Sequence, residues 1–176
     1  RKPDVVGLQE AYRFACLPYP DVPVPPGRGC DDPDIKGAFS DQLANTLAAL
    51  RGKYALAGKV TNLQVAAIPF WVNGFPALLS LEDRDAILVR NGLTAQPVSF
   101  AATSWLCSKP SADGCNYVTA PPVFEIRDPD DPTTVLLTIA VERGFVGVDV
   151  TVRGQGYRVF NTHLEQRLLG EGLLET

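Results

Sequence analysis

Three runs of β-branched and apolar residues follow one another closely near the end of the 176-residue chain. They cover residues 134–141, 144–152 and 157–163. β-Branched and aromatic side chains favour strands, and the Gly-Gln-Gly tripeptide at 154–156 has the composition of a hairpin turn. The pattern predicts an antiparallel meander, in which the third strand returns to the end of the sheet where the second begins.

The third run ends in polar residues that include His163, the only histidine of the chain. An imidazole at a strand end, where loops begin, can meet a ligand in its neutral or charged form. Glu165 either orients this imidazole or is a solvated loop acid. Arg143 precedes the second run, and the planar guanidinium of arginine suits phosphate oxygens. The alternatives are a structural histidine and a surface arginine that pairs with Glu142.

The chain opens with a short apolar strand at residues 4–8, which is followed by Gln9 and Glu10. An uninterrupted apolar run indicates a strand that is buried on both faces. Magnesium prefers oxygen ligands, keeps several waters and needs only one or two protein carboxylates. A glutamate at the end of such a strand is therefore a candidate metal ligand.

Three short motifs occur in order along the chain: PDVVGLQE at residues 3–10, ERG at 142–144 and NTHLE at 161–165. Together they resemble the endonuclease/exonuclease/phosphatase superfamily, which includes pancreatic-type deoxyribonucleases, neutral sphingomyelinases and inositol polyphosphate phosphatases. The resemblance implies an α+β fold: half of a β-sandwich of predominantly antiparallel strands, flanked by helices in a four-layer αββα arrangement. It also implies a metal-dependent phosphoesterase that hydrolyses phosphodiester or phosphomonoester bonds.

The resemblance also implies roles for individual residues. Glu10 is the implied ligand of Mg²⁺, with Mn²⁺ or Ca²⁺ as alternative ions. Arg143 and His163 are the implied catalytic residues, which approach the scissile phosphate or the leaving group. Asp85 and Asn161 fall on the implied substrate-binding side. Relatives often have Asn or Tyr where this chain has Asp85, and the alternative is that this carboxylate pairs with a neighbouring arginine or caps a turn.

Several elements of the family pattern do not occur in these 176 residues. The family begins with a strand that carries an asparagine, and later has a GDxN motif and an Asp-His pair that activates water. We therefore expect residues 1–176 to be a single partial domain, the N-terminal portion without its first strand, and to be inactive alone. The missing C-terminal half, or another chain, should cover an exposed apolar face of the sheet.

The competing function is a non-catalytic binding or scaffold domain that keeps the fold but not the activity. Nucleic acid, phospholipid and sugar phosphate are all candidate substrates of the enzyme. The formal net charge of −4 disfavours undirected binding to nucleic acid, which needs a basic face.

Outside the motifs, the pattern predicts further elements. A helix is expected over residues 42–51, because leucines recur at helical spacing after a capping Ser40 or Asp41 and before Gly52. Residues 12–36 are rich in proline and glycine, which predicts a long irregular loop. Residues 63–81 are apolar but interrupted by Pro and Gly, and they are not assigned. Strands are predicted at residues 54–60, 83–90, 96–106 and 123–127.

The four cysteines fall into two local pairs, each in a segment with loop composition. We expect disulfides between Cys16 and Cys30 and between Cys107 and Cys115, with free buried thiols as the alternative. Disulfides indicate an oxidising compartment, so the protein is expected to be secreted or periplasmic. No apolar run is long enough to span a membrane.

Overall fold

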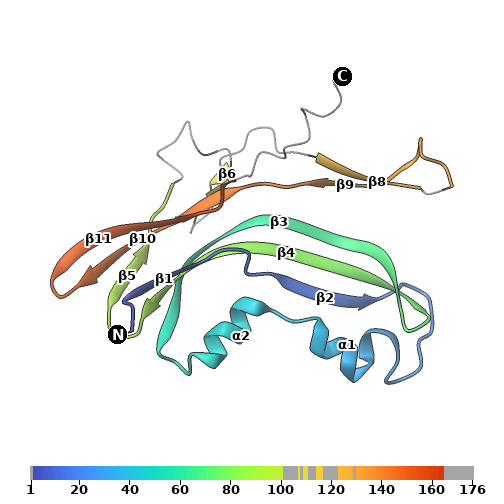
Figure 1. Ribbon diagram of the computed structural model, residues 1–176, viewed down its shortest axis with the longest axis horizontal. Coiled ribbons are helices and arrows are strands. Elements are labelled where there is room, and N and C mark those ends of the chain that lie inside the picture. Colours follow the sequence, from blue (N-terminus) through green and yellow to red (C-terminus); the bar gives the residue numbers. More distant parts are fainter. Residues whose placement is uncertain are drawn as a thin grey trace, which may run out of the picture.

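The computed structural model describes residues 2–100, 107, 109–110, 114–116, 123–128 and 130–164. Within these residues, eleven β-strands form three sheets, and two α-helices lie beside them. All the strand pairings among them are antiparallel. The helices, the first sheet and the second sheet are stacked in this order (Figure 1).

The first sheet is built around a long central strand, β4, which pairs with β3 along one edge and with β1 and then β2 along the other. Its strands are β1 (Val5–Leu8), β2 (Arg13–Pro18), β3 (Tyr54–Val72) and β4 (Phe75–Arg90). Asn73 and Gly74 join β3 to β4, and both have positive φ angles, 47° and 83°. Two-residue turns of this kind match the twist of the flanking strands, so β3 and β4 form one long hairpin.

The helices cover the outer face of the first sheet (Figure 1). They are α1 (Pro33–Ala38) and α2 (Gln42–Ala49), preceded by a short 3₁₀ helix, η1 (Gly29–Asp31). Asp41 caps α2 by accepting a hydrogen bond from the Ala44 amide. The same carboxylate accepts two hydrogen bonds from Arg84 of β4, at 2.6 and 3.1 Å, and thereby ties the helix to the sheet.

The second sheet is built around β10, which pairs with β5, β7 and β11. The strands are β5 (Thr94–Pro97), β6 (Lys109–Pro110), β7 (Gly114–Asn116), β10 (Gly144–Val152) and β11 (Gln155–Thr162). A separate two-stranded sheet contains β8 (Val123–Arg127) and β9 (Val135–Ala140).

The main core lies between the first and second sheets. It contains Val60, Ile87 and Val89 of the first sheet, and Val146, Val148 and Val150 of the second. Along β4, Ala86 and Leu88 instead belong to the core under α2, because successive strand residues point to opposite faces. The same alternation turns Asp83 and Asp85 toward the second sheet, beyond the apolar part of the core.

The predicted α+β fold with four layers is wrong. The described residues form a mostly antiparallel β structure, and their two α-helices are only six and eight residues long. The physical reason is that, among the described residues, the two helical segments are short, whereas residues 54–90 form one long β-hairpin. Both helices cover the same face of the first sheet (Figure 1).

Several smaller expectations are also corrected. The segment predicted as irregular contains β2 and the first four residues of α1, and the strand predicted at 54–60 continues to Val72. The predicted turn at 154–156 instead lies at Arg153-Gly154, and β9 pairs with β8 and not with β10, so only the last two strands of the predicted meander are neighbours. Of the strand predicted at 96–106, β5 ends at Pro97, and residues 101–106 lie outside the described residues.

Both predicted disulfides are confirmed: Cys16 is bonded to Cys30, and Cys107 to Cys115. Such bonds are compatible with an extracellular protein. Among the described residues, no helix combines the length and the apolar character that a membrane span requires.

Candidate functional site

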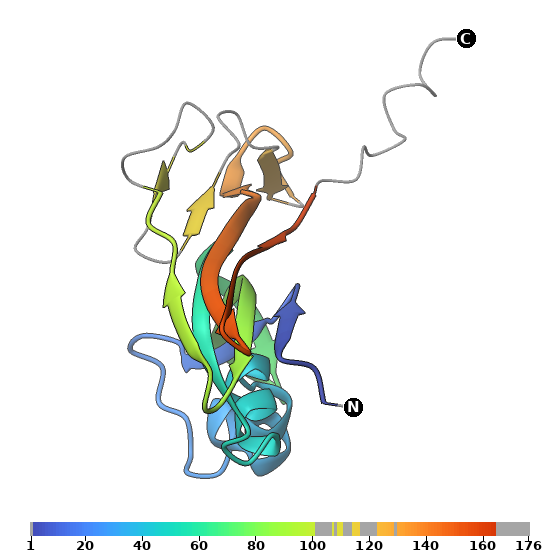
Figure 2. The same cartoon turned by 90° about the vertical axis from the view of Figure 1, so that its left-hand side faces the viewer.

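Charged side chains from both sheets meet where β1 and β11 end and β10 begins. Asn161 and Gln9 make hydrogen bonds that link the end of β11 to the end of β1. Figure 2 shows the two strands, which belong to different sheets, on the same side of the molecule. His163 Nε2 lies 3.7 Å from Glu10 Oε1, and the backbone N–H of His163 donates to the carbonyl of Gly144, the residue after Arg143. The structure thus brings Glu10, Arg143 and His163 to one rim of the two sheets.

Glu10 occupies an unusual backbone conformation at this rim. Its φ is +53°, in the left-handed region that non-glycine residues seldom adopt. The Glu10 N–H donates to Asp85 Oδ1 at 3.3 Å, and the next amide, that of Ala11, donates to the carbonyl of Arg84 at 2.8 Å. The Glu10 side chain is 53% exposed, so its carboxylate is accessible from solvent.

Two carboxylates lie between the sheets behind Glu10. The side chains of Asp83 and Asp85 are 2% and 0% exposed, respectively. Burial raises the pKa of both groups, and the negative charge of Asp85 raises the pKa of Asp83 further. Asn62, His163 and Arg143 oppose the effect of burial on the pKa of Asp85.

Basic side chains next to β10 and β11 lie against these carboxylates. Arg143 Nη1 lies 3.4 Å from Asp83 Oδ2, and His163 Nδ1 lies 3.8 Å from Asp85 Oδ1. The Arg143 side chain is only 14% exposed. Its ion pair with Asp83 differs from the surface pair with Glu142 that the sequence left open.

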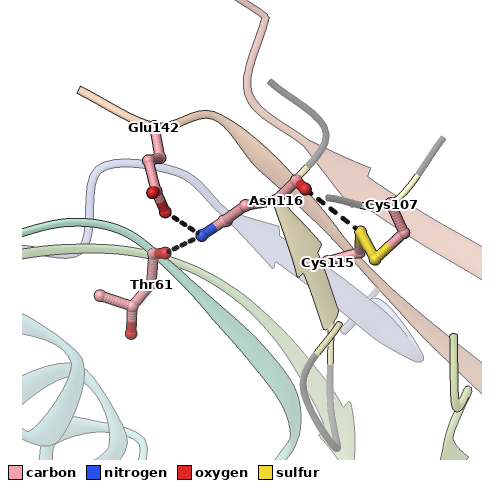
Figure 3. The surroundings of a disulfide bond; sticks show 5 residues. All are labelled: Thr61, Cys107, Cys115, Asn116 and Glu142. Carbon is pink, nitrogen blue, oxygen red and sulfur yellow. Dashed lines mark hydrogen bonds between the residues drawn. A yellow bond between two sulfur atoms is a disulfide. The ribbon is translucent and has the colours of Figure 1, made fainter. Parts of the chain in front are cut away.

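Glu142 is held by a separate set of contacts next to a disulfide (Figure 3). Asn116 Nδ2 donates to Glu142 Oε2 at 2.6 Å and to the Thr61 carbonyl at 3.1 Å, and Lys109 forms an ion pair with Glu142. Cys115, which forms the disulfide with Cys107, immediately precedes Asn116 on β7. These contacts fix the backbone just before Arg143.

Asp85 and Asn161, predicted on the substrate side, both contact protein groups. Asn161 Nδ2 donates to the carbonyls of Leu8 and Ala86, at 2.7 and 3.1 Å, and so joins β11 to β1 and β4. Asp85 has no exposed surface. Substrate contact by either residue stays a prediction, and this geometry favours a supporting role for both.

The sequence interpretation missed Asp83, Asn62, Asn116 and Tyr12. Tyr12 lies beside the acids, and burial, Asp83 and Glu10 raise the pKa of its hydroxyl group. The spacing of Asp83, two residues before Asp85 in a strand, was the available signal, since residues i and i+2 share a face. Glu165 lies outside the described residues.

The described residues offer few ligands for the implied magnesium ion. Among the described residues, no three His, Cys, Asp or Glu side chains form a group that could hold a metal. One half-exposed carboxylate, that of Glu10, fits a magnesium ion that keeps most of its water ligands. It does not fit an ion enclosed by protein ligands.

A groove of about 570 Å³ lies between β3 and β9, next to this site. Asn62, Asn116 and Glu142 line its polar part, and Leu137 and Ile139 line part of its apolar wall. Asn62 also neighbours Asp85 and lowers its pKa. The groove therefore adjoins the buried acids.

Comparisons with protein-family models, with curated proteins and with solved structures give no match to this chain.

Proposed function

We propose that this chain supplies the phosphate-binding and metal-binding part of a metal-dependent phosphoesterase. The supporting observation is that Glu10, Arg143 and His163, which lie far apart in the sequence, meet at one rim. A half-exposed carboxylate, a guanidinium and an imidazole are the groups that a phosphate ester and its cation require. The disulfides favour a secreted or periplasmic location for this enzyme.

In the proposed mechanism, each residue has one task. Glu10 would hold a Mg²⁺ ion, which would supply charge neutralisation at the phosphate oxygens. Arg143 donates hydrogen bonds to the non-bridging oxygens, where charge develops in the transition state. His163 donates a proton or a hydrogen bond to the phosphate or the leaving group. None of these three residues is assigned the activation of water.

The test is isothermal titration calorimetry, in which inorganic phosphate is added to residues 1–176 in the presence of Mg²⁺. Arg143→Ala should weaken phosphate binding by about 10-fold or more, because a hydrogen bond to a charged group is lost. Glu10→Gln should remove the dependence of binding on Mg²⁺. Arg158→Ala is the matched control, because Arg158 is an exposed arginine of β11 that pairs with Asp149. Equal phosphate affinities for Arg143→Ala and Arg158→Ala would contradict the proposal.

A non-catalytic binding domain is the second candidate. It is favoured by the small ligand set, since the described residues hold no group of three metal-binding side chains. If the chain is a binding domain, its affinity for phosphate should be the same with Mg²⁺ and with EDTA. If it is part of a metal-dependent enzyme, EDTA should weaken phosphate binding.

A further inference from the structure

One oxygen atom, Asp85 Oδ1, links the metal-binding and phosphate-binding sides of the rim. It accepts a hydrogen bond from the Glu10 N–H at 3.3 Å and lies 3.8 Å from His163 Nδ1. The second distance is too long for a hydrogen bond but lies within ion-pair range. The end of β1 and the end of β11 therefore meet the same carboxylate oxygen of β4.

The backbone at Glu10 needs such a partner. A non-glycine residue with φ of +53° persists only where its surroundings determine the conformation. Asp85 binds the Glu10 amide, and the carbonyl of Arg84 binds the following amide. Because Asp85 is fully buried in the central strand, it offers a rigid point of attachment.

We propose that Asp85 is a positioning residue that holds the Glu10 backbone and the His163 ring in the arrangement required at the rim. This inference rests on the proposed function for the statement that the rim binds metal and phosphate. That Asp85 holds Glu10 and His163 in place rests only on its two contacts with them. The charge of Asp85 favours a ring orientation in which Nδ1 faces the carboxylate, which leaves Nε2 toward Glu10 and the open side.

Two variants separate the two contacts. Asp85→Asn keeps a side-chain oxygen that can accept from the Glu10 N–H but loses the charge that faces His163. Asp85→Ala loses both. Asp149→Asn is the control, because Asp149 lies on β10 and pairs with Arg158 at the surface.

The experiment uses nuclear magnetic resonance on residues 1–176, where the only imidazole signals are those of His163. Asp85→Asn should change the ¹⁵N shifts of the imidazole and leave the Glu10 amide protected from hydrogen exchange. Asp85→Ala should also abolish that protection. A titration with Mg²⁺ should give about 10-fold weaker binding in Asp85→Ala, the typical effect of removing a residue that orients a ligand.

Unchanged imidazole shifts in Asp85→Asn would overturn the proposal, and this result is decisive even if Asp85→Ala does not fold. Failure of the wild type to bind Mg²⁺ or phosphate would instead count against the proposed function. In that case the imidazole shifts and the Glu10 amide still decide whether Asp85 positions the rim.

Discussion

Asp83 and Asp85 place two carboxylates between packed sheets, where little water reaches them. Both side chains are almost completely buried, and burial raises the pKa of each. Arg143 and His163 lie 3.4 and 3.8 Å away and offset part of the cost. Ionisable groups with perturbed pKa values are concentrated at functional sites, so this electrostatic strain is itself a reason to look for function here.

The first prediction concerns Asp83→Asn. Since the pKa of Asp83 is raised in the folded state, its contribution to stability is present below the unfolded value of about 3.9 and is lost as pH rises through the folded pKa. The substitution should therefore increase the free energy of unfolding, relative to the wild type, by more at pH 7 than at pH 3. Urea unfolding at both pH values measures this difference.

Asp149→Asn should show the opposite dependence, because Arg158 lowers the pKa of Asp149 in the folded state. The stability from that carboxylate is present above its unfolded pKa and is lost as pH falls through the folded pKa. If the change in unfolding free energy caused by Asp83→Asn is the same at pH 3 and pH 7, ionisation of Asp83 does not destabilise the folded state.

The residues of the rim differ in how far the sequence could reveal them. Glu10, Arg143 and His163 lie next to the ends of apolar runs, so a simple strand pattern places them at the ends of strands. Asp83 lies inside a strand of sixteen residues, and its burial depends on how two sheets pack. Asn116 is equally hidden, because its contacts reach residues 55 and 26 positions away in the chain.

At the level of elements, the start of β10 is packed tightly against β7. A Cβ added to Gly144 would lie 2.5 Å from Asn116 Oδ1 and 2.6 Å from the Cys115 carbonyl oxygen. Only glycine leaves room for the backbone of β7 at this point. The close approach helps to fix Arg143, which immediately precedes β10.

The second prediction is that Gly144→Ala destabilises the protein by about 1–3 kcal/mol, the usual range for overpacking. The measurement is the free energy of unfolding in urea. Gly156→Ala in β11 is the matched control, because nothing lies within 4 Å of the added Cβ. A loss for Gly144→Ala no larger than that of the control would show that β7 and β10 can separate freely.

The third prediction concerns the disulfide between β2 and η1. Cys16 and Cys30 are separated by 14 residues in sequence. Closing a loop of this size stabilises the folded state by ~3 kcal/mol through the entropy of the unfolded chain. The Cys16→Ser/Cys30→Ser double variant should lose about that much free energy of unfolding, and an unchanged value would contradict the loop-closure account.

Elements with uninterrupted patterns were predicted well, and those with prolines were not. Strand β8 and the pairing of β10 with β11 were expected, and α2 differs from its prediction by two residues at the C-terminal end. The hairpin of β3 and β4 was missed because Pro69 and Pro76 resemble strand breakers. In the structure, Pro76 lies next to the hairpin turn, and Pro69 follows a register shift between Val65 and Ile68. Proline is tolerated in strands at such edges and irregularities.

On the scale of the molecule, exposed apolar side chains of the described residues gather on the two-stranded sheet. The hairpin of β8 and β9 exposes large apolar side chains, with Phe124 47% and Leu136 58% exposed. Isolated two-stranded hairpins are marginally stable in water. The sequence predicts an exposed apolar face on the main sheet. It does not predict the exposed side chains of this hairpin, because strand patterns alone do not show which strands pair.

The last prediction concerns the activity of residues 1–176 as a whole. With Mg²⁺ present, the purified chain should bind inorganic phosphate but should not hydrolyse bis(p-nitrophenyl) phosphate above the rate without protein. Hydrolysis needs a base that activates water. The only histidine of the chain has Nδ1 near Asp85 and Nε2 near Glu10, which suits contact with phosphate. The resemblance assigns water activation to a different Asp-His pair.

Release of p-nitrophenolate measures the activity, with EDTA and Glu10→Gln as controls for traces of a contaminating enzyme. Magnesium-dependent release that disappears in both controls and in His163→Ala would show that the rim is complete in itself. Water activation would then come from the rim itself, either from His163 or from a carboxylate, that of Glu10, Asp83 or Asp85. Of the three carboxylates, only that of Glu10 is half exposed to solvent, so Glu10 and His163 would be the residues to examine as the base.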